Sequence, residues 1–146
     1  MSIHEVERLI NQLDNPIRKA KVKAVEQLKS LTIFPDIISD STLFINKCFV
    51  PIIKHLENTT ESIREDCLSI IDKSIKNLGP ENLQNILVHL VPAIFSRLKN
   101  QSIEPSEQIR HLLIIQLSSI IQMITPETTP NTFDSYISGL FDPLDS

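Results

Sequence analysis

The sequence repeats one pattern, in which an apolar run with an internal proline is followed by a second apolar run that begins with an arginine. Residues 49–56 (FVPIIKHL) can be laid over residues 90–98 (LVPAIFSRL) with one inserted residue. Arg64 and Arg110 then occupy the same place in their units, and Lys21 takes that place in an earlier unit. The units recur at a spacing of about 43 to 46 positions, a length at which paired helices repeat. The chain is therefore predicted to be an array of helical pairs.

The composition supports a helical chain. Hydrophobic residues make up 41% of the sequence, aromatic residues only 5%, and there are two glycines. Two glycines are too few for the many tight turns that an all-β chain needs. Long apolar runs with helical spacing favour helices. The expected fold class is all-α, with a core of mostly isoleucine, leucine and valine. At 146 residues the chain is long enough to bury such a core.

Breaks in the apolar periodicity divide residues 1–124 into repeat units at about 3–31, 43–78 and 83–124. Within the second boundary, Gly79 and Pro80 form a strong signal to end one helix and begin the next. In an array of this kind each unit buries its apolar face against its neighbours, and three units are the lower limit for a stable array.

The end of the sequence is expected to differ from the array. Residues 125–132 contain two prolines and no large apolar residue, and are predicted to be a linker. Residues 133–146 again show apolar residues at helical spacing, like the first half of a further unit without its second half. This partial repeat is expected either to fold back on the array or to fray.

The repeat resembles HEAT repeats, because it combines paired helices, a proline within the first helix and an apolar residue with arginine early in the second. The resemblance implies an armadillo-like α-solenoid of about three HEAT-type helical pairs and a partial fourth. In HEAT families an aspartate after the first helix and the arginine of the second commonly form a ladder between repeats. Asp14 fits the acidic position, but Asn58 and Asn100 follow in the later units and Lys21 stands for arginine in the first. These departures put the ladder in doubt.

A more specific resemblance covers residues 91–123. The pairs Val91-Pro92 and Arg97-Leu98, followed by residues 103–112 (IEPSEQIRHL), look like the N-terminal array of the HEAT-repeat axonemal dynein assembly factors, the HEAT-repeat-containing protein 2 family. Residues 141–143 (FDP) are similar to the end of that family's next first helix. The family is much longer than this chain, which implies a fragment or a truncated relative.

The family resemblance implies a non-enzymatic cytoplasmic factor that helps to preassemble axonemal dynein arms before they enter the cilium. Its implied partners are axonemal dynein chains and chaperones. No binding role from the family carries over to a particular residue of this sequence.

Charge and hydropathy argue against several other classes of partner. The formal net charge is −4 and the pI about 5.5, whereas domains that bind nucleic acid usually show a basic face. The first residues lack the basic start and apolar core of a signal peptide, and no apolar run approaches the roughly 20 residues of a membrane span. We therefore expect a cytoplasmic protein with protein partners, and no nucleic acid, membrane or small-molecule substrate.

No motif for catalysis, for a cofactor or for a metal ion is present. The four histidines lack HExxH or zinc-ligand spacing, and two glycines are too few for a phosphate-binding loop. Cys48 and Cys67 lack CxxC spacing and fall on apolar positions of the expected helices, so they are predicted to be small buried hydrophobic residues. We expect no enzyme and no cofactor.

One basic cluster stands out, in the second helix of the first unit: Arg18, Lys19, Lys21, Lys23 and Lys29. Such a charge run on an amphipathic helix is more often a solvated face than a site for an acidic partner.

If the general HEAT arrangement holds, the second helices line a concave, protein-binding surface. Candidate contact residues are those that interrupt the apolar faces there and are expected to be exposed: Lys19, Lys23, Arg64, Asp72, Lys76 and Gln116.

Two further functions remain open on sequence grounds. One is a generic HEAT-repeat adaptor of the transport-receptor or phosphatase-scaffold type. The other is a HEAT-like DNA glycosylase, in which basic residues hold the DNA backbone and aromatic residues contact the damaged base. The glycosylase is disfavoured because the chain has no Trp, one Tyr and an acidic balance.

Overall fold

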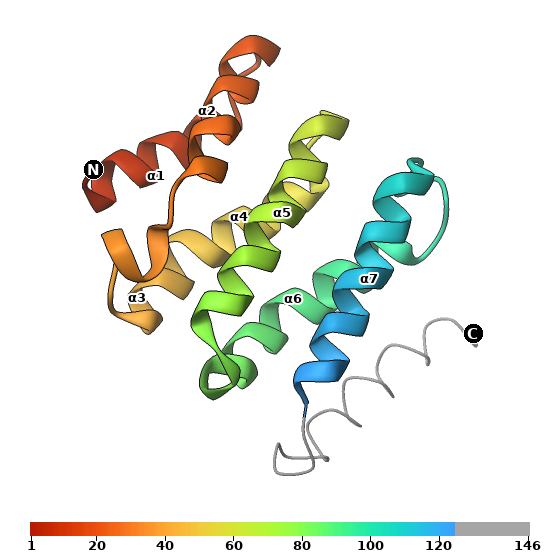
Figure 1. The fold of residues 1–146 in the computed structure, drawn as a ribbon. Helices are drawn as coiled ribbons and strands as arrows, with labels where there is room; N and C mark the ends of the chain where they lie inside the picture. The colour runs from red at the N-terminus through yellow and green to blue at the C-terminus, as the bar shows by residue number, and fades with distance from the viewer. Residues whose placement is uncertain (125–146) are drawn as a thin grey trace. The chain divides into compact units, whose positions relative to one another are not determined.

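The computed structural model describes residues 1–124, and these residues are helical without a strand (Figure 1). The predicted all-α fold of successive helical pairs is confirmed. The linker predicted at 125–132 and the partial repeat at 133–146 lie outside the described residues. The chain divides into two compact parts, and the boundary falls inside one helix, between His89 and Leu90.

The first pair consists of α1 (Ile3–Gln12) and α2 (Arg18–Ser30), which pack against each other. The Ser2 hydroxyl accepts a hydrogen bond from the Glu5 backbone N–H and so caps α1. The apolar residues at helical spacing are buried in both helices: Val6, Leu9 and Ile10 in α1, and Ala24, Val25 and Leu28 in α2.

The first helix of the second pair is broken into several short segments. After the π-helical turn η1 (Ile33–Ile37) come α3 (Ser41–Phe44), the π-helical turn η2 (Ile45–Phe49), α4 (Val50–Lys54) and the 3-10 turn η3 (His55–Glu57). The sequence indicated an apolar run at residues 49–56 with an internal proline, Pro51. Because proline donates no hydrogen bond to the preceding turn, the wider turn η2 lies just before it.

Helix α5 (Glu61–Leu78) completes the second pair and packs against α2, α4 and η1. Its inward residues Ile63, Cys67, Ile71 and Ile75 are almost fully buried. Figure 1 shows α2 and α5, the second helices of two successive pairs, side by side.

The end of α5 confirms the predicted stop and restart. Gly79 has a φ of +77°, which residues with a side chain rarely adopt, and Pro80 begins the 3-10 turn η4 (Pro80–Asn82). The chain then enters the next helix, α6.

The third pair is formed by α6 (Leu83–Leu98), with Pro92 inside it, and α7 (Glu107–Met123). Ser106 caps α7 by accepting a hydrogen bond from the Ile109 N–H at 3.2 Å. This is the helix start that the sequence predicted. Leu113 and Ile120 are buried on α7, whereas Ile114, Ile115 and Ile121 of the same helix are about half exposed, at 52%, 46% and 50%.

Candidate protein-interaction surface

The structure places the predicted contact residues in two groups. Lys19 and Lys23 are exposed on α2, and Lys76 is exposed on α5. Asp72, half-buried on α5, pairs with Lys76 at 2.9 Å one helical turn away. Nothing in the structure tests whether these four residues bind a partner, so their role stays a prediction.

Arg64 and Gln116 are not exposed, which corrects the expectation for both. Arg64 is 6% exposed, and its Nη1 donates to the carbonyl oxygens of Asn58 at 2.9 Å and Thr59 at 3.5 Å, in the turn before α5. Gln116 is 4% exposed on α7. Polar residues that interrupt an apolar stripe were assumed to face solvent, but the long side chain of Arg64 turns inward because backbone acceptors are within its reach. The buried Gln116 Nε2 has no hydrogen-bond partner within the described residues.

The side chains of the basic cluster on α2 do not form one continuous exposed surface. Lys21 is buried at 9% exposure, and Lys29 pairs with Asp66 of α5 at 2.9 Å. The side chains of Arg18, Lys19 and Lys23 are exposed and form no hydrogen bond or ion pair within residues 1–124. Of this cluster, these three cations therefore form the exposed and unpaired part on α2 within residues 1–124.

Lys21 contributes to a polar contact between the first two pairs that the sequence did not reveal. Its Nζ lies 3.5 Å from the Thr59 hydroxyl and 3.4 Å from the Thr60 hydroxyl. Beside it, the Asn58 side-chain amide donates to the Leu13 carbonyl oxygen at 2.9 Å. Lysine, threonine and asparagine thus join these repeats at the position where HEAT families commonly place aspartate and arginine.

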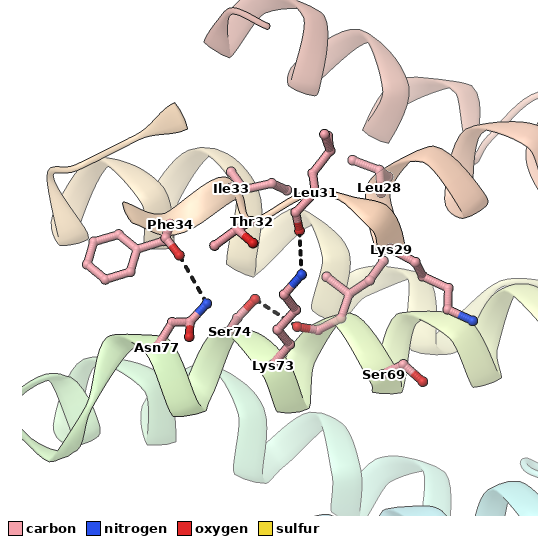
Figure 2. A pocket seen from close by; sticks show the side chains of 11 residues that line it. Leu28, Lys29, Leu31, Thr32, Ile33, Phe34, Ser69, Lys73, Ser74 and Asn77 are labelled. Carbon is pink, nitrogen blue, oxygen red and sulfur yellow. Dashed lines mark hydrogen bonds between the residues drawn. The ribbon is translucent and has the colours of Figure 1, made fainter. Parts of the chain in front are cut away.

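A second set of contacts joins α5 to the end of α2 and the segment after it. Lys73 Nζ donates to the Leu31 carbonyl oxygen at 2.9 Å, and the Asn77 side-chain amide donates to the Phe34 carbonyl oxygen at 3.1 Å. Figure 2 shows both side chains reaching from α5 to the segment above it. Lys73 supplies positive charge to carbonyl groups at the C-terminus of α2, where a helix favours a cation.

These contacts border a pocket of about 160 Å³ between α2, residues 31–34 and α5 (Figure 2). Its apolar lining comes from Leu28, Leu31, Ile33, Phe34 and Ile70, and its polar lining from Lys29, Thr32, Ser69, Lys73, Ser74 and Asn77. Within the first part of the molecule, the second helices thus combine exposed charge with a small recess.

The two cysteine thiols are in unreactive settings. Cys48 and Cys67 are fully buried, which confirms them as small core residues, and burial raises the pKa of each thiol to about 12. At neutral pH both are protonated and therefore poor nucleophiles. Among residues 1–124 no cluster of His, Cys, Asp and Glu is arranged to hold a metal ion.

Within the same described residues, none of the helices has the length and apolar character needed to cross a membrane.

The comparisons with known proteins give a single positive finding. A protein-family model described as "Dynein axonemal assembly factor 5-like, TPR repeats" matches residues 11–141. No curated protein and no solved structure matches the chain. The family description calls the repeats TPR where the sequence resembled HEAT; both are helical-pair repeats, and TPR units are about 34 residues long, shorter than the spacing here. The match covers most of the sequence, so the chain belongs to the family of dynein axonemal assembly factor 5-like repeat proteins.

Proposed function

We propose that this chain is a non-enzymatic scaffold that holds protein partners during the cytoplasmic preassembly of axonemal dynein arms. The observation that carries the proposal is the family match over residues 11–141, because the family is described by its repeats and by dynein assembly. The helical-pair fold is consistent with this role, since stacked helical pairs present extended surfaces to other proteins.

The setting of the potentially reactive groups supports binding over catalysis. Both cysteine thiols are buried with pKa values raised to about 12. The one buried histidine, His55, has a lowered pKa, mainly because of burial, and lies next to an asparagine amide at 3.3 Å. Neither setting resembles a nucleophile activated by an adjacent base.

The partner surface that we propose lies on the second helices α2 and α5. Lys19 and Lys23 supply unpaired positive charge there, and Asp72 and Lys76 form an ion pair that can exchange for a contact with a partner. The recess bordered by α2, residues 31–34 and α5 would receive an apolar side chain of the same partner. Exposed charges of this kind contribute mainly to the rate and selectivity of association.

The test is affinity capture of the tagged chain from ciliated cells that are building cilia, with bound proteins identified by mass spectrometry. We expect axonemal dynein heavy chains or their chaperones among the captured proteins. Recovery of transport cargo or phosphatase subunits in their place would contradict the dynein role and favour a generic adaptor.

A pair of matched variants locates the surface. Lys23→Glu with Lys76→Glu reverses two charges on α2 and α5, and Lys47→Glu with Lys99→Glu reverses two exposed charges outside these helices. We expect the first variant to lose most of the captured dynein chains and the second to retain them. Equal retention by both would place the partner surface elsewhere.

A further inference from the structure

Lys21 is a nearly buried cation without an anionic partner. It is 9% exposed, and within residues 1–124 the hydrogen-bond partners of its Nζ are two threonine hydroxyls, at 3.4 and 3.5 Å, near the outer limit of a hydrogen bond. No carboxylate forms an ion pair with it within residues 1–124. Buried lysines are rare in proteins unless they are paired, so a cation in this position calls for a reason.

A hollow of about 490 Å³ lies beside Lys21, within the first part of the molecule. It sits where the turn between α1 and α2 meets the turn before α5, and its lining combines apolar and polar side chains: Ile10, Asn11, Leu13, Asp14, Lys21, Pro51, Lys54, His55, Glu57, Asn58 and Thr59. Its volume falls within the range of ordinary ligand sites, roughly 300 to 1,000 Å³.

His55 lines the same hollow. It carries no negative charge that could balance the charge of Lys21. Its Nδ1 lies 3.3 Å from the Asn58 side-chain amide nitrogen and 4.0 Å from Asp14 Oδ1. Burial is the main cause of its lowered pKa; Asp14 raises the pKa, and Lys21 lowers it further. The positive charge of Lys21 is therefore felt at His55.

We propose that this hollow binds the carboxylate of a glutamate side chain from a partner polypeptide, with the Lys21 ammonium as its counter-charge. The site extends the proposed scaffold role by naming the chemistry of a partner, and it rests on that role only in so far as the partner is a protein. The carboxylate would replace the weak hydroxyl contacts with a charge-assisted hydrogen bond.

The lining favours this occupant over a phosphate group. Asp14 and Glu57 bring negative charge to the hollow, and this charge repels a dianion more strongly than a monoanion. Ile10 and Pro51 offer apolar contact to the methylene groups of glutamate, which aspartate has in smaller number.

The test is a nuclear magnetic resonance titration of the full chain with a blocked hexaglutamate peptide, and with hexaglutamine as the neutral control. We expect hexaglutamate alone to shift the backbone amides of Lys21, Asn58 and Thr59 in a saturable manner. Lys21→Met should weaken the binding roughly tenfold or more, because it removes the buried cation of the hollow, whereas the second lysine of the lining, Lys54, is exposed to solvent.

Lys47→Met is the matched control, since it removes the same charge from an exposed position outside the hollow and outside α2 and α5. We expect it to weaken binding no more than about twofold. If both variants weaken binding equally, or if the shifts follow the exposed face of α2, the peptide binds by general charge attraction and the proposed site is wrong.

A third variant tests the site without changing a buried residue, in case Lys21→Met does not fold. The Asp14 side chain is 80% exposed, so Asp14→Asn leaves the fold intact, and removing its negative charge should tighten hexaglutamate binding roughly twofold. Unchanged affinity in this variant would count against the hollow as the site. Displacement of the peptide by inorganic phosphate at lower concentration than by acetate would overturn the choice of carboxylate. Dynein capture does not enter this experiment, so either proposal can fail alone.

Discussion

The turns before α5 and before α7 begin alike but are stabilised by different chemistry. In each, the side-chain oxygen of an asparagine, Asn58 or Asn100, accepts from the backbone N–H two residues later at 2.9 Å. The first turn then uses neutral groups, since Asn58 also donates to the Leu13 carbonyl oxygen and its own carbonyl oxygen accepts from Arg64. The second turn uses a buried ion pair.

The acidic member of this ion pair lies in residues that the first turn lacks. From Asn58 to Ile63 the chain advances five positions, whereas from Asn100 to the corresponding Ile109 it advances nine. The longer turn contains Glu104, which is fully buried, pairs with Arg97 at 3.0 Å and accepts from the Ser106 N–H at 3.2 Å. An insertion that buries a carboxylate requires a nearby cation, because an unpaired buried charge is strongly destabilising.

The largest effect should come from the cores beside the turns, and it should be the same for both. Cys67 and Leu113 lie four residues after Ile63 and Ile109, and are 0% and 1% exposed. Cys67→Asp and Leu113→Asp should each lower the free energy of unfolding by about 5 kcal/mol or more, because each buries an unpaired carboxylate. Denaturant unfolding of the full chain measures this, with Ile114→Asp on the exposed side of α7 as control. A small loss at Leu113 would show that the assignment of the buried face of α7 is wrong.

Breaking the ion pair should have the next largest effect, confined to the second turn. Arg97→Met keeps much of the side-chain volume but leaves Glu104 buried without its cation, and should cost about 3 to 4 kcal/mol. Arg97→Met combined with Glu104→Leu should recover most of the loss. Thermal unfolding of the variants checks both outcomes, and a double variant as unstable as Arg97→Met alone would mean that the charge pairing is not what stabilises this turn.

Substitution of the two asparagines, Asn58 and Asn100, should lower stability by different amounts, because only Asn58 joins two repeats. Asn58→Ala removes the turn bond and also leaves the Leu13 carbonyl oxygen without its side-chain donor, which should cost about 2 kcal/mol. Asn100→Ala removes only bonds within an exposed turn and should cost about 0.5 to 1 kcal/mol. The comparison needs only chemical denaturation, and equal losses would contradict the role of Asn58 between repeats.

The smallest effect should be a pH dependence of the first turn. Because burial lowers the pKa of His55 below 6.5, the unfolded chain takes up a proton more readily than the folded chain as the pH falls. The stability that neutral His55 contributes is therefore complete above about pH 6.5 and decreases as the pH falls from there toward the folded-state pKa. His55→Gln should flatten this part of the curve of unfolding midpoint against pH, and an unchanged curve would exclude His55 as its cause.

Local signals in the sequence were sufficient for several of the helix ends. Gly79 with Pro80 marked the end of α5, and Ser106 marked the start of α7, because capping depends on residues within one turn of the chain. The same holds for the burial of Cys67 and Leu113, which follows from apolar periodicity alone. Pro51 was correctly predicted to lie within the first helix of its pair, but the division of that helix into α3, η2 and α4 was not predicted.

The candidate surface depended on the tertiary structure. The sequence by itself determined that the chain is all-α, that its helices come in pairs and that α2 carries a basic cluster. Only the tertiary structure decided that Lys21 and Arg64 lie inside. For Lys21 the reason is that helical periodicity describes neighbours within one turn, while its partners come from a distant part of the chain. The hydroxyls near Lys21 are 38 and 39 positions away, and packing of one repeat against the next brings them together.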